Sequence, residues 1–122
     1  MHQIKIEVKT HFIASHSNEE AGEYAFAYTI TITNESEHKV QLLKRAWKIT
    51  DADHKITRVA GDGVVGEQPT IAPGESYSYT SGTVIATPIG MMEGFYTMVS
   101  ETGTTFDVEI PTFRLAVPNI IH

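Results

Sequence analysis

The segment from Gly61 to Gly66 has the glycine spacing G-x-G-x-x-G, which in other proteins can bind the phosphates of a dinucleotide. Its six residues are Gly61, Asp62, Gly63, Val64, Val65 and Gly66. That fingerprint binds phosphate because it joins a strand to a helix whose N-terminus faces the pyrophosphate. Here Pro69 and Pro73 follow closely, and Asp62 and Glu67 place negative charge where a phosphate would lie. The sequence therefore predicts a glycine-rich loop with no helix after it.

Two interpretations of this loop stay open. In the structural one, the glycines are present because positive φ angles or close backbone packing exclude side chains. In the functional one, the loop binds pyrophosphate or a nucleotide through backbone N–H groups that form a nest, without a helix dipole. The loop contains no lysine of the kind that a P-loop uses, so the functional interpretation depends on the backbone alone.

Carboxylates and histidines give two weaker candidates for chemistry. Asp51, Asp53 and His54 lie within one turn and could bind a cation, although such a turn is more often a solvated hairpin tip. Asp107 and Glu109 share a face of an expected strand, the minimum for a carboxylate pair, and alternation with apolar neighbours predicts that this face is the exposed one. The chain has no cysteine, and neighbouring residues supply no complete set of nucleophile, base and orienting group. We therefore expect no catalytic residue, no metal site and no cofactor.

Positive charge is concentrated around Trp47. The basic residues there are Lys39, Lys44, Arg45 and Lys48. Their side chains could contact an acidic partner, or they could simply be solvated, and the sequence does not separate these alternatives. Trp47 itself is expected in the core.

The length and charge of the chain narrow the classes of function. Its 122 residues predict a single domain, 1–122, that can bury a core without metal ions or disulfides. A net charge of −6 repels nucleic acid and anionic lipid, so we expect neither nucleic acid nor a membrane as a partner. No apolar run approaches the roughly 18 residues of a membrane span, and the N-terminus lacks a signal-peptide pattern. Together with the absence of cysteine, these features predict a cytoplasmic protein.

Apolar and polar residues alternate with a period of two, which is typical of β-strands. The expected strands are 4–12, 24–33, 39–50, 55–60, 76–81, 94–100, 105–110 and 112–117. Within 39–50 the apolar positions change from even to odd numbers, so we expect a β-bulge or a break near Leu42 and Leu43. The one helical signal, from Ser17 to Glu20, allows at most a single turn.

Turn residues separate the expected strands. Pro73 and Gly74 fit the two central positions of a type II turn, and the polar segments 34–37, 51–54 and 101–104 have hairpin length. Pro111 cannot donate to a ladder, so it must divide two strands or lie on an edge. About eight short strands with regularly spaced turns predict an all-β fold. We assign an immunoglobulin-like or fibronectin type III-like two-sheet antiparallel β-sandwich.

Several runs of the sequence together resemble the bacterial ApaG (CorD) family. They are FAYTITI (26–32), QLLKRAW (41–47), GDGVVGEQPTIAPGE (61–75), TPIGMMEGFY (87–96) and IPTFRLAVP (110–118). The resemblance implies a fibronectin type III-like sandwich and identifies 1–122 as a single ApaG domain. It also implies a link to cobalt and magnesium homeostasis and a pyrophosphate site at Gly61, Gly63 and Gly66. Similar domains in a eukaryotic F-box adaptor and in a DNA-polymerase-interacting protein indicate an interaction module.

We therefore predict a non-enzymatic domain that binds a protein partner through its sheet surface and loops. Exposed strand edges could also pair with another copy, so a homodimer is a further expectation. The alternative function is that of a nucleotide or pyrophosphate binder, or a weak phosphohydrolase, centred on Gly61–Gly66. A third hypothesis is a cation-responsive protein that uses surface carboxylates and His54.

Overall fold

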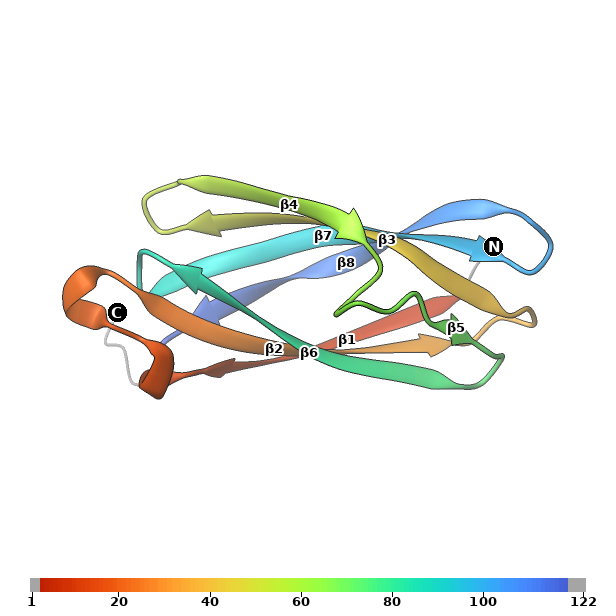
Figure 1. The fold of residues 1–122 in the computed structure, drawn as a ribbon, viewed down its shortest axis with the longest axis horizontal. Helices are drawn as coiled ribbons and strands as arrows, with labels where there is room; N and C mark the ends of the chain where they lie inside the picture. Colours follow the sequence, from red (N-terminus) through yellow and green to blue (C-terminus); the bar gives the residue numbers. More distant parts are fainter. Residues whose placement is uncertain (1–2, 119–122) are drawn as a thin grey trace.

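Two antiparallel sheets pack face to face in the computed structural model, which describes residues 3–118 (Figure 1). The three-stranded sheet has the order β1-β2-β6, with β1 at Ile4–Phe12, β2 at Tyr24–Asn34 and β6 at Ser76–Ile85. The five-stranded sheet has the order β4-β3-β7-β8, and the short β5 also pairs with β3. Its strands are β3 (Val40–Asp51), β4 (Ile56–Asp62), β5 (Thr70–Ile71), β7 (Ile89–Ser100) and β8 (Thr105–Ala116). The predicted all-β two-sheet sandwich is confirmed.

Some expectations fall at the ends of the chain. The predicted domain boundaries at 1 and 122 lie outside the described residues. Within residues 3–118, no helix has the length and apolar character needed to cross a membrane.

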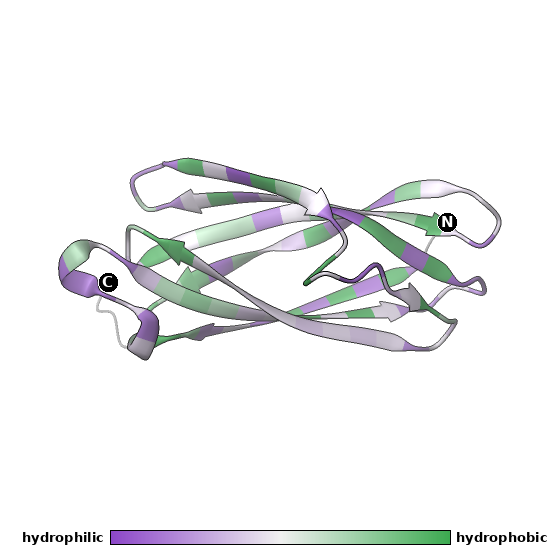
Figure 2. Ribbon diagram, in the orientation of Figure 1, coloured by the Kyte–Doolittle hydropathy of each residue, from purple (hydrophilic) through white to green (hydrophobic). Residues whose placement is uncertain are grey.

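The core lies between the inner faces of the two sheets, because apolar and polar side chains alternate along most strands (Figure 2). Trp47 is 5% exposed, which confirms its predicted place in the core. Its ring centroid lies 5.4 Å from that of Tyr28 on the opposite sheet and 5.8 Å from that of Phe113. Tyr79 of β6 and Tyr96 of β7 add a polar contact, because their buried hydroxyl groups hydrogen-bond to each other across the sandwich.

The predicted change of phase in β3 is a β-bulge. The register of β3 against β7 shifts between Leu42 and Lys44, so Leu43 is the extra residue. Leu42 before the shift and Trp47 after it are both buried, although one has an even number and the other an odd number. The bulge therefore keeps apolar side chains on the inner face along the whole strand.

Strands β6, β7 and β8 differ most from their predicted extents, and the short β5 was not predicted. The expected strands 105–110 and 112–117 form one strand, β8, which lies at a sheet edge and changes register near Pro111. β7 begins at Ile89, well before the predicted start at Gly94. A Cβ atom on Gly94 would lie 2.1 Å from the carbonyl oxygen of Ala46, so this glycine marks a close approach of β7 to β3 and not a strand end. β6 runs on to Ile85 because Gly82 pairs regularly with Ala27.

The connection at 34–37 was predicted as a hairpin, and this prediction is wrong. β2 and β3 lie in different sheets, so the connection crosses the sandwich. The buried Asn34 holds the crossing, since its Nδ2 donates to the carbonyl oxygens of His38 at 2.7 Å and Ile71 at 2.9 Å. Polarity and length alone do not reveal which sheet the next strand joins.

The other turn predictions are confirmed. Residues 51–54 and 101–104 close the hairpins β3-β4 and β7-β8. Gly74 has φ 80°, and the N–H of Glu75 donates to the carbonyl of Ala72 at 3.0 Å, as a type II turn requires. The helical signal gives one 3₁₀ turn, Glu19–Ala21, and a second 3₁₀ turn at Ala14–His16 was not predicted.

Loss of both tyrosine hydroxyls should destabilise the sandwich by less than the sum of the two single losses. Tyr79→Phe leaves the buried Tyr96 hydroxyl without its partner, which is expected to lower the free energy of unfolding by about 1–3 kcal/mol. The double variant Y79F/Y96F removes both polar groups and should cost less than the sum of the single variants. Urea unfolding of the wild type, the two single variants and the double variant measures these free energies. Strictly additive losses of unfolding free energy would contradict the inferred contact.

Candidate functional site

The glycine-rich loop forms a tight two-residue turn, not the start of a helix. Val65 and Gly66 both have positive φ angles, 49° and 78°. The flanking residues Val64 and Glu67 exchange two backbone hydrogen bonds, of 2.8 Å and 2.9 Å. After this turn the chain stays extended until β5. This geometry agrees with the prediction that no helix follows Gly66.

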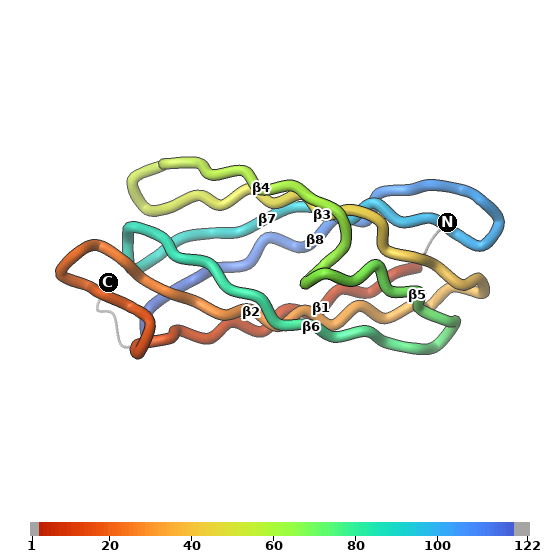
Figure 3. Tube along the Cα trace, in the orientation of Figure 1, coloured from red at the N-terminus to blue at the C-terminus, as the bar shows by residue number. Residues whose placement is uncertain are grey.

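The loop is also fastened to the bulge of β3. The N–H of Gly63 donates to the Leu43 carbonyl oxygen at 2.8 Å, and the side-chain amide of Gln68 donates to the same oxygen at 3.0 Å. The Arg45 side chain also binds the loop, because its Nη1 donates to the carbonyl oxygens of Asp62 at 2.9 Å and Gly63 at 3.0 Å. Figure 3 shows the chain bending inward after β4, where Val64 is fully buried.

These contacts leave the loop few groups for an anion. The amides of Gly63, Val64 and Glu67 already donate within the protein, and the guanidinium of Arg45 already binds carbonyl oxygens. Within residues 3–118, only the amides of Val65 and Gly66 in this turn have no acceptor. A nest needs successive N–H groups that converge on the ligand. The geometry of Gly61–Gly66 therefore favours the structural interpretation, while pyrophosphate binding stays an untested prediction.

The Asp51 turn is likewise occupied by its own backbone. Oδ1 of the buried Asp51 accepts hydrogen bonds from the N–H groups of Asp53 and Lys55, each at 2.9 Å. His54 occupies the left-handed region with φ 63° at the hairpin tip. No group of three or more His, Cys, Asp or Glu side chains in the described part of the chain could hold a metal ion. The structure thus does not bring Asp51, Asp53 and His54 together as a cation site.

The titratable groups with clear pKa shifts serve the fold. Burial raises the pKa of both Tyr79 and Tyr96 far above the ordinary tyrosine range, so both phenols remain neutral in the core. The backbone N–H of Lys39, which donates to Glu101 at 2.8 Å, lowers the pKa of that carboxyl, and His38 adds to the effect. These three groups lie in the core and at the β7-β8 hairpin.

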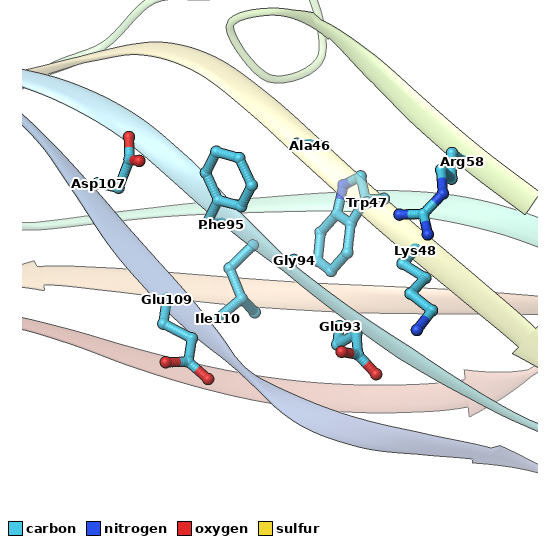
Figure 4. A pocket seen from close by; sticks show the side chains of 10 residues that line it. All are labelled: Ala46, Trp47, Lys48, Arg58, Glu93, Gly94, Phe95, Asp107, Glu109 and Ile110. Atoms are coloured by element: carbon cyan, nitrogen blue, oxygen red, sulfur yellow. The ribbon is translucent and has the colours of Figure 1, made fainter.

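A feature that the sequence did not reveal lies on the outer face of the five-stranded sheet. The cross-strand register places Ala60, Ala46, Phe95 and Glu109 in one row across β4, β3, β7 and β8. The Phe95 side chain points outward and is 43% exposed. Because its neighbours across β3 and β4 are alanines, the ring stands beside hollows of 540 Å³ and 360 Å³ and lines both of them (Figure 4). We call this surface the Phe95 face.

Charged side chains surround the Phe95 face. Lys48 and Arg58 lie directly opposite each other on β3 and β4, and neither forms an ion pair in the described structure. Asp107 and Glu109, on β8, lie across the hollow from this basic pair (Figure 4). Both carboxylates are exposed, as predicted. The outer face therefore combines one aromatic ring with a basic side and an acidic side.

Known proteins match nearly the whole chain. A family model described as the ApaG domain matches residues 14–100. "Protein ApaG" from Thiobacillus denitrificans is 51% identical over 121 residues, which cover 99% of this chain and 95% of the relative. "Protein ApaG" from Vibrio cholerae is 54% identical over 119 residues, with coverages of 98% and 94%. The crystal structure of the "putative ApaA protein" from Bordetella pertussis is 42% identical and has a TM-score of 0.94, with coverages of 98% and 97%.

Two glycine substitutions test whether the glycine-rich loop is packed tightly against its own backbone. A Cβ atom on Gly63 would lie 2.1 Å from the Glu67 carbonyl oxygen, whereas a Cβ atom on Gly66 would meet nothing within 4 Å. Both residues have positive φ, so Gly66→Ala should cost about 1 kcal/mol through backbone strain alone. Gly63→Ala must also move the backbone and should cost more than about 3 kcal/mol. If the two variants lose the same free energy of unfolding in urea, the loop is not closely packed at Gly63.

Proposed function

The chain belongs to the ApaG domain family, and from this premise we propose that it is a non-enzymatic domain that binds a protein partner through the Phe95 face. The observation that carries the proposal is the exposed Phe95 ring between two hollows with charged sides. Hot spots of protein interfaces are typically aromatic side chains with a polar rim around them. The Phe95 face has this arrangement.

The small residues beside Phe95 favour contact with an apolar side chain of the partner. Ala46, Ala60 and Gly94 keep the surface beside the ring low, so a partner side chain can pack against the edge or face of Phe95. Covering the exposed part of a phenylalanine ring contributes on the order of 1 kcal/mol. The ring therefore supplies a modest anchor, and the charges around it supply orientation.

The basic pair defines the chemistry of the partner further. Lys48 and Arg58 are like charges in directly opposite positions, which is unfavourable, and Glu93, opposite Lys48 on β7, offsets this repulsion only from the Lys48 side. A carboxylate of the partner would relieve this repulsion and steer the encounter. We propose a partner that presents an apolar side chain next to an acidic one. The net charge of −6 makes this basic pair a local exception on an acidic protein.

The other hypotheses have less support from the geometry. The Gly61–Gly66 loop uses the amides of Gly63 and Val64 internally, and the Asp51 turn binds its own backbone. In this proposal, any role in cobalt and magnesium homeostasis depends on the protein partner and not on a cation held by this domain.

Photo-crosslinking tests the proposed face directly. A benzophenone amino acid in place of Phe95 should give discrete crosslinked protein products in the native host cell. The matched control carries the same group in place of Thr31, on the outer face of the three-stranded sheet, and should give none of these products. Arg58→Glu, combined with the photo-reactive group at position 95, should lower the yield several-fold because it opposes an acidic partner. Identical product patterns from positions 95 and 31 would contradict the proposal.

A further inference from the structure

Strand β6 has a free backbone edge. It is the last strand of the three-stranded sheet, and only β2 pairs with it. The N–H of Asn34 donates to the carbonyl of Glu75 at 3.0 Å, so even-numbered residues of β2 direct their backbone groups toward β6. Their partners on β6 have odd numbers. The even-numbered residues of β6 therefore direct N–H and C=O groups away from the sheet: Ser76, Ser78, Thr80, Gly82 and Val84.

The other outer strands carry features that discourage pairing, and β6 does not. Edge strands usually avoid unwanted pairing with charged residues, prolines or bulges. Such features are Lys5, Glu7 and Lys9 on β1, Arg58 and Asp62 on β4, and Asp107, Glu109 and Pro111 on β8. The ten residues of β6 contain no charged residue and no proline, and their register with β2 is continuous (Figure 2). Among the described edges, β6 is thus the one open to a further strand.

A row of hydroxyl pairs keeps this edge clear of its own side chains. Thr33–Ser76, Thr31–Ser78 and Thr29–Thr80 hydrogen-bond at 2.7 Å each, across β2 and β6. Each hydroxyl on β6 thereby points toward β2 and away from the free edge. The pairs also fix β6 to β2, so the edge is presented by a well-held strand and not by a frayed one.

A groove of mixed polarity continues inward from the edge, with Asp51, Lys55, Thr57 and Thr83 lining it beside its apolar residues. A hollow of 150 Å³ lies between the end of β6 and the edge strand β4 of the other sheet. Val84 on β6 is 59% exposed and Val59 on β4 is 40% exposed, and both line this hollow with Ile49 and Ile85. On the opposite side of the sandwich, β1 and β8 lie against each other. The β4-β6 side is therefore the open side of the sandwich.

We propose that β6 accepts an additional β-strand, supplied by an extended segment of a different protein. Its backbone pairs with the outward groups of Ser78, Thr80, Gly82 and Val84, and its alternate apolar side chains enter the groove beside Val59. Recognition by strand addition takes affinity from main-chain hydrogen bonds and specificity from alternate side-chain pockets. This site lies on the other sheet from the Phe95 face and does not depend on it.

A second copy of this chain fits the edge less well. The inward side chains of its β6, such as Tyr77 and Tyr79, already pack against its own core and could not enter the groove. Two chains with a net charge of −6 each would also repel one another. The occupant is thus an extended segment whose inward side chains are free.

Selection from a phage-displayed library of random peptides tests the inference, with each peptide long enough for a strand of about 5–6 residues. Peptides selected on the intact domain should alternate apolar and polar residues. Ser78→Lys should weaken their binding at least about tenfold, because a lysine now stands beside the edge. Thr31→Lys is the matched control: it breaks the same hydroxyl pair and puts lysine on the same face, but not at the edge, and should bind as the wild type does. Val84→Lys, at an exposed position, provides a second edge variant.

Amide hydrogen exchange of the complex gives the deciding readout. Bound peptide should slow exchange at Ser78, Thr80, Gly82 and Val84, while Phe95→Ala should leave peptide binding unchanged. The inference is overturned if no alternating peptide is selected, if Ser78→Lys binds like the wild type, or if slowing occurs at other strands. A dimer seen by sedimentation and abolished by Ser78→Lys would likewise overturn it in favour of self-pairing. Loss of binding in Phe95→Ala alone would instead assign the peptides to the Phe95 face.

Discussion

The carbonyl oxygen of Leu43 accepts two hydrogen bonds, from the backbone of Gly63 and from the side chain of Gln68. Leu43 is the extra residue of the bulge and has no register partner in β7. A strand of regular register would have turned either Leu42 or Trp47 toward solvent, since side chains alternate with a period of two. The bulge keeps both inside, and the loop after β4 covers the backbone groups that the bulge leaves unpaired. The glycine-rich segment is thereby part of the sheet's hydrogen bonding.

The residues that β3 exposes on the outer face of its sheet depend on the same bulge. Beyond the bulge, β3 presents Lys44, Ala46 and Lys48 on its outer face, and the register sets Ala46 beside Phe95. Gly94 lets β7 approach β3 closely at this point, and the Phe95 ring lies beside the small side chain of Ala46. The three-stranded sheet has no bulge between its strands, and its β6 keeps a continuous and uncharged edge. One sheet therefore offers a side-chain surface, and the other offers a main-chain edge.

The sequence was informative wherever a local rule decides the structure. The change of apolar phase predicted the bulge at Leu42–Leu43, and Pro73-Gly74 predicted its turn, because strand alternation and turn geometry involve only near neighbours. The hairpin predicted at 34–37 was wrong, because the choice of sheet depends on where Asn34 finds carbonyl partners, one of them at Ile71. The run Phe95, Tyr96, Met98 and Val99 is apolar on both faces, which predicts a central strand and gives no sign that Phe95 is exposed. Only the register shows that Ala46 and Ala60 stand beside it and leave the ring exposed.

The amides of Gly63, Val64 and Glu67 donate within the protein and hold the glycine-rich loop in place, and on this ground we propose that binding is left to the sheet surfaces. Backbone amide exchange at these three residues, measured by NMR with and without pyrophosphate, tests this most directly. Slow exchange is expected at all three amides in the free protein, with no change in their rates or chemical shifts on adding pyrophosphate. Fast exchange in the free protein, with protection and shift changes at these amides on adding pyrophosphate, would contradict it.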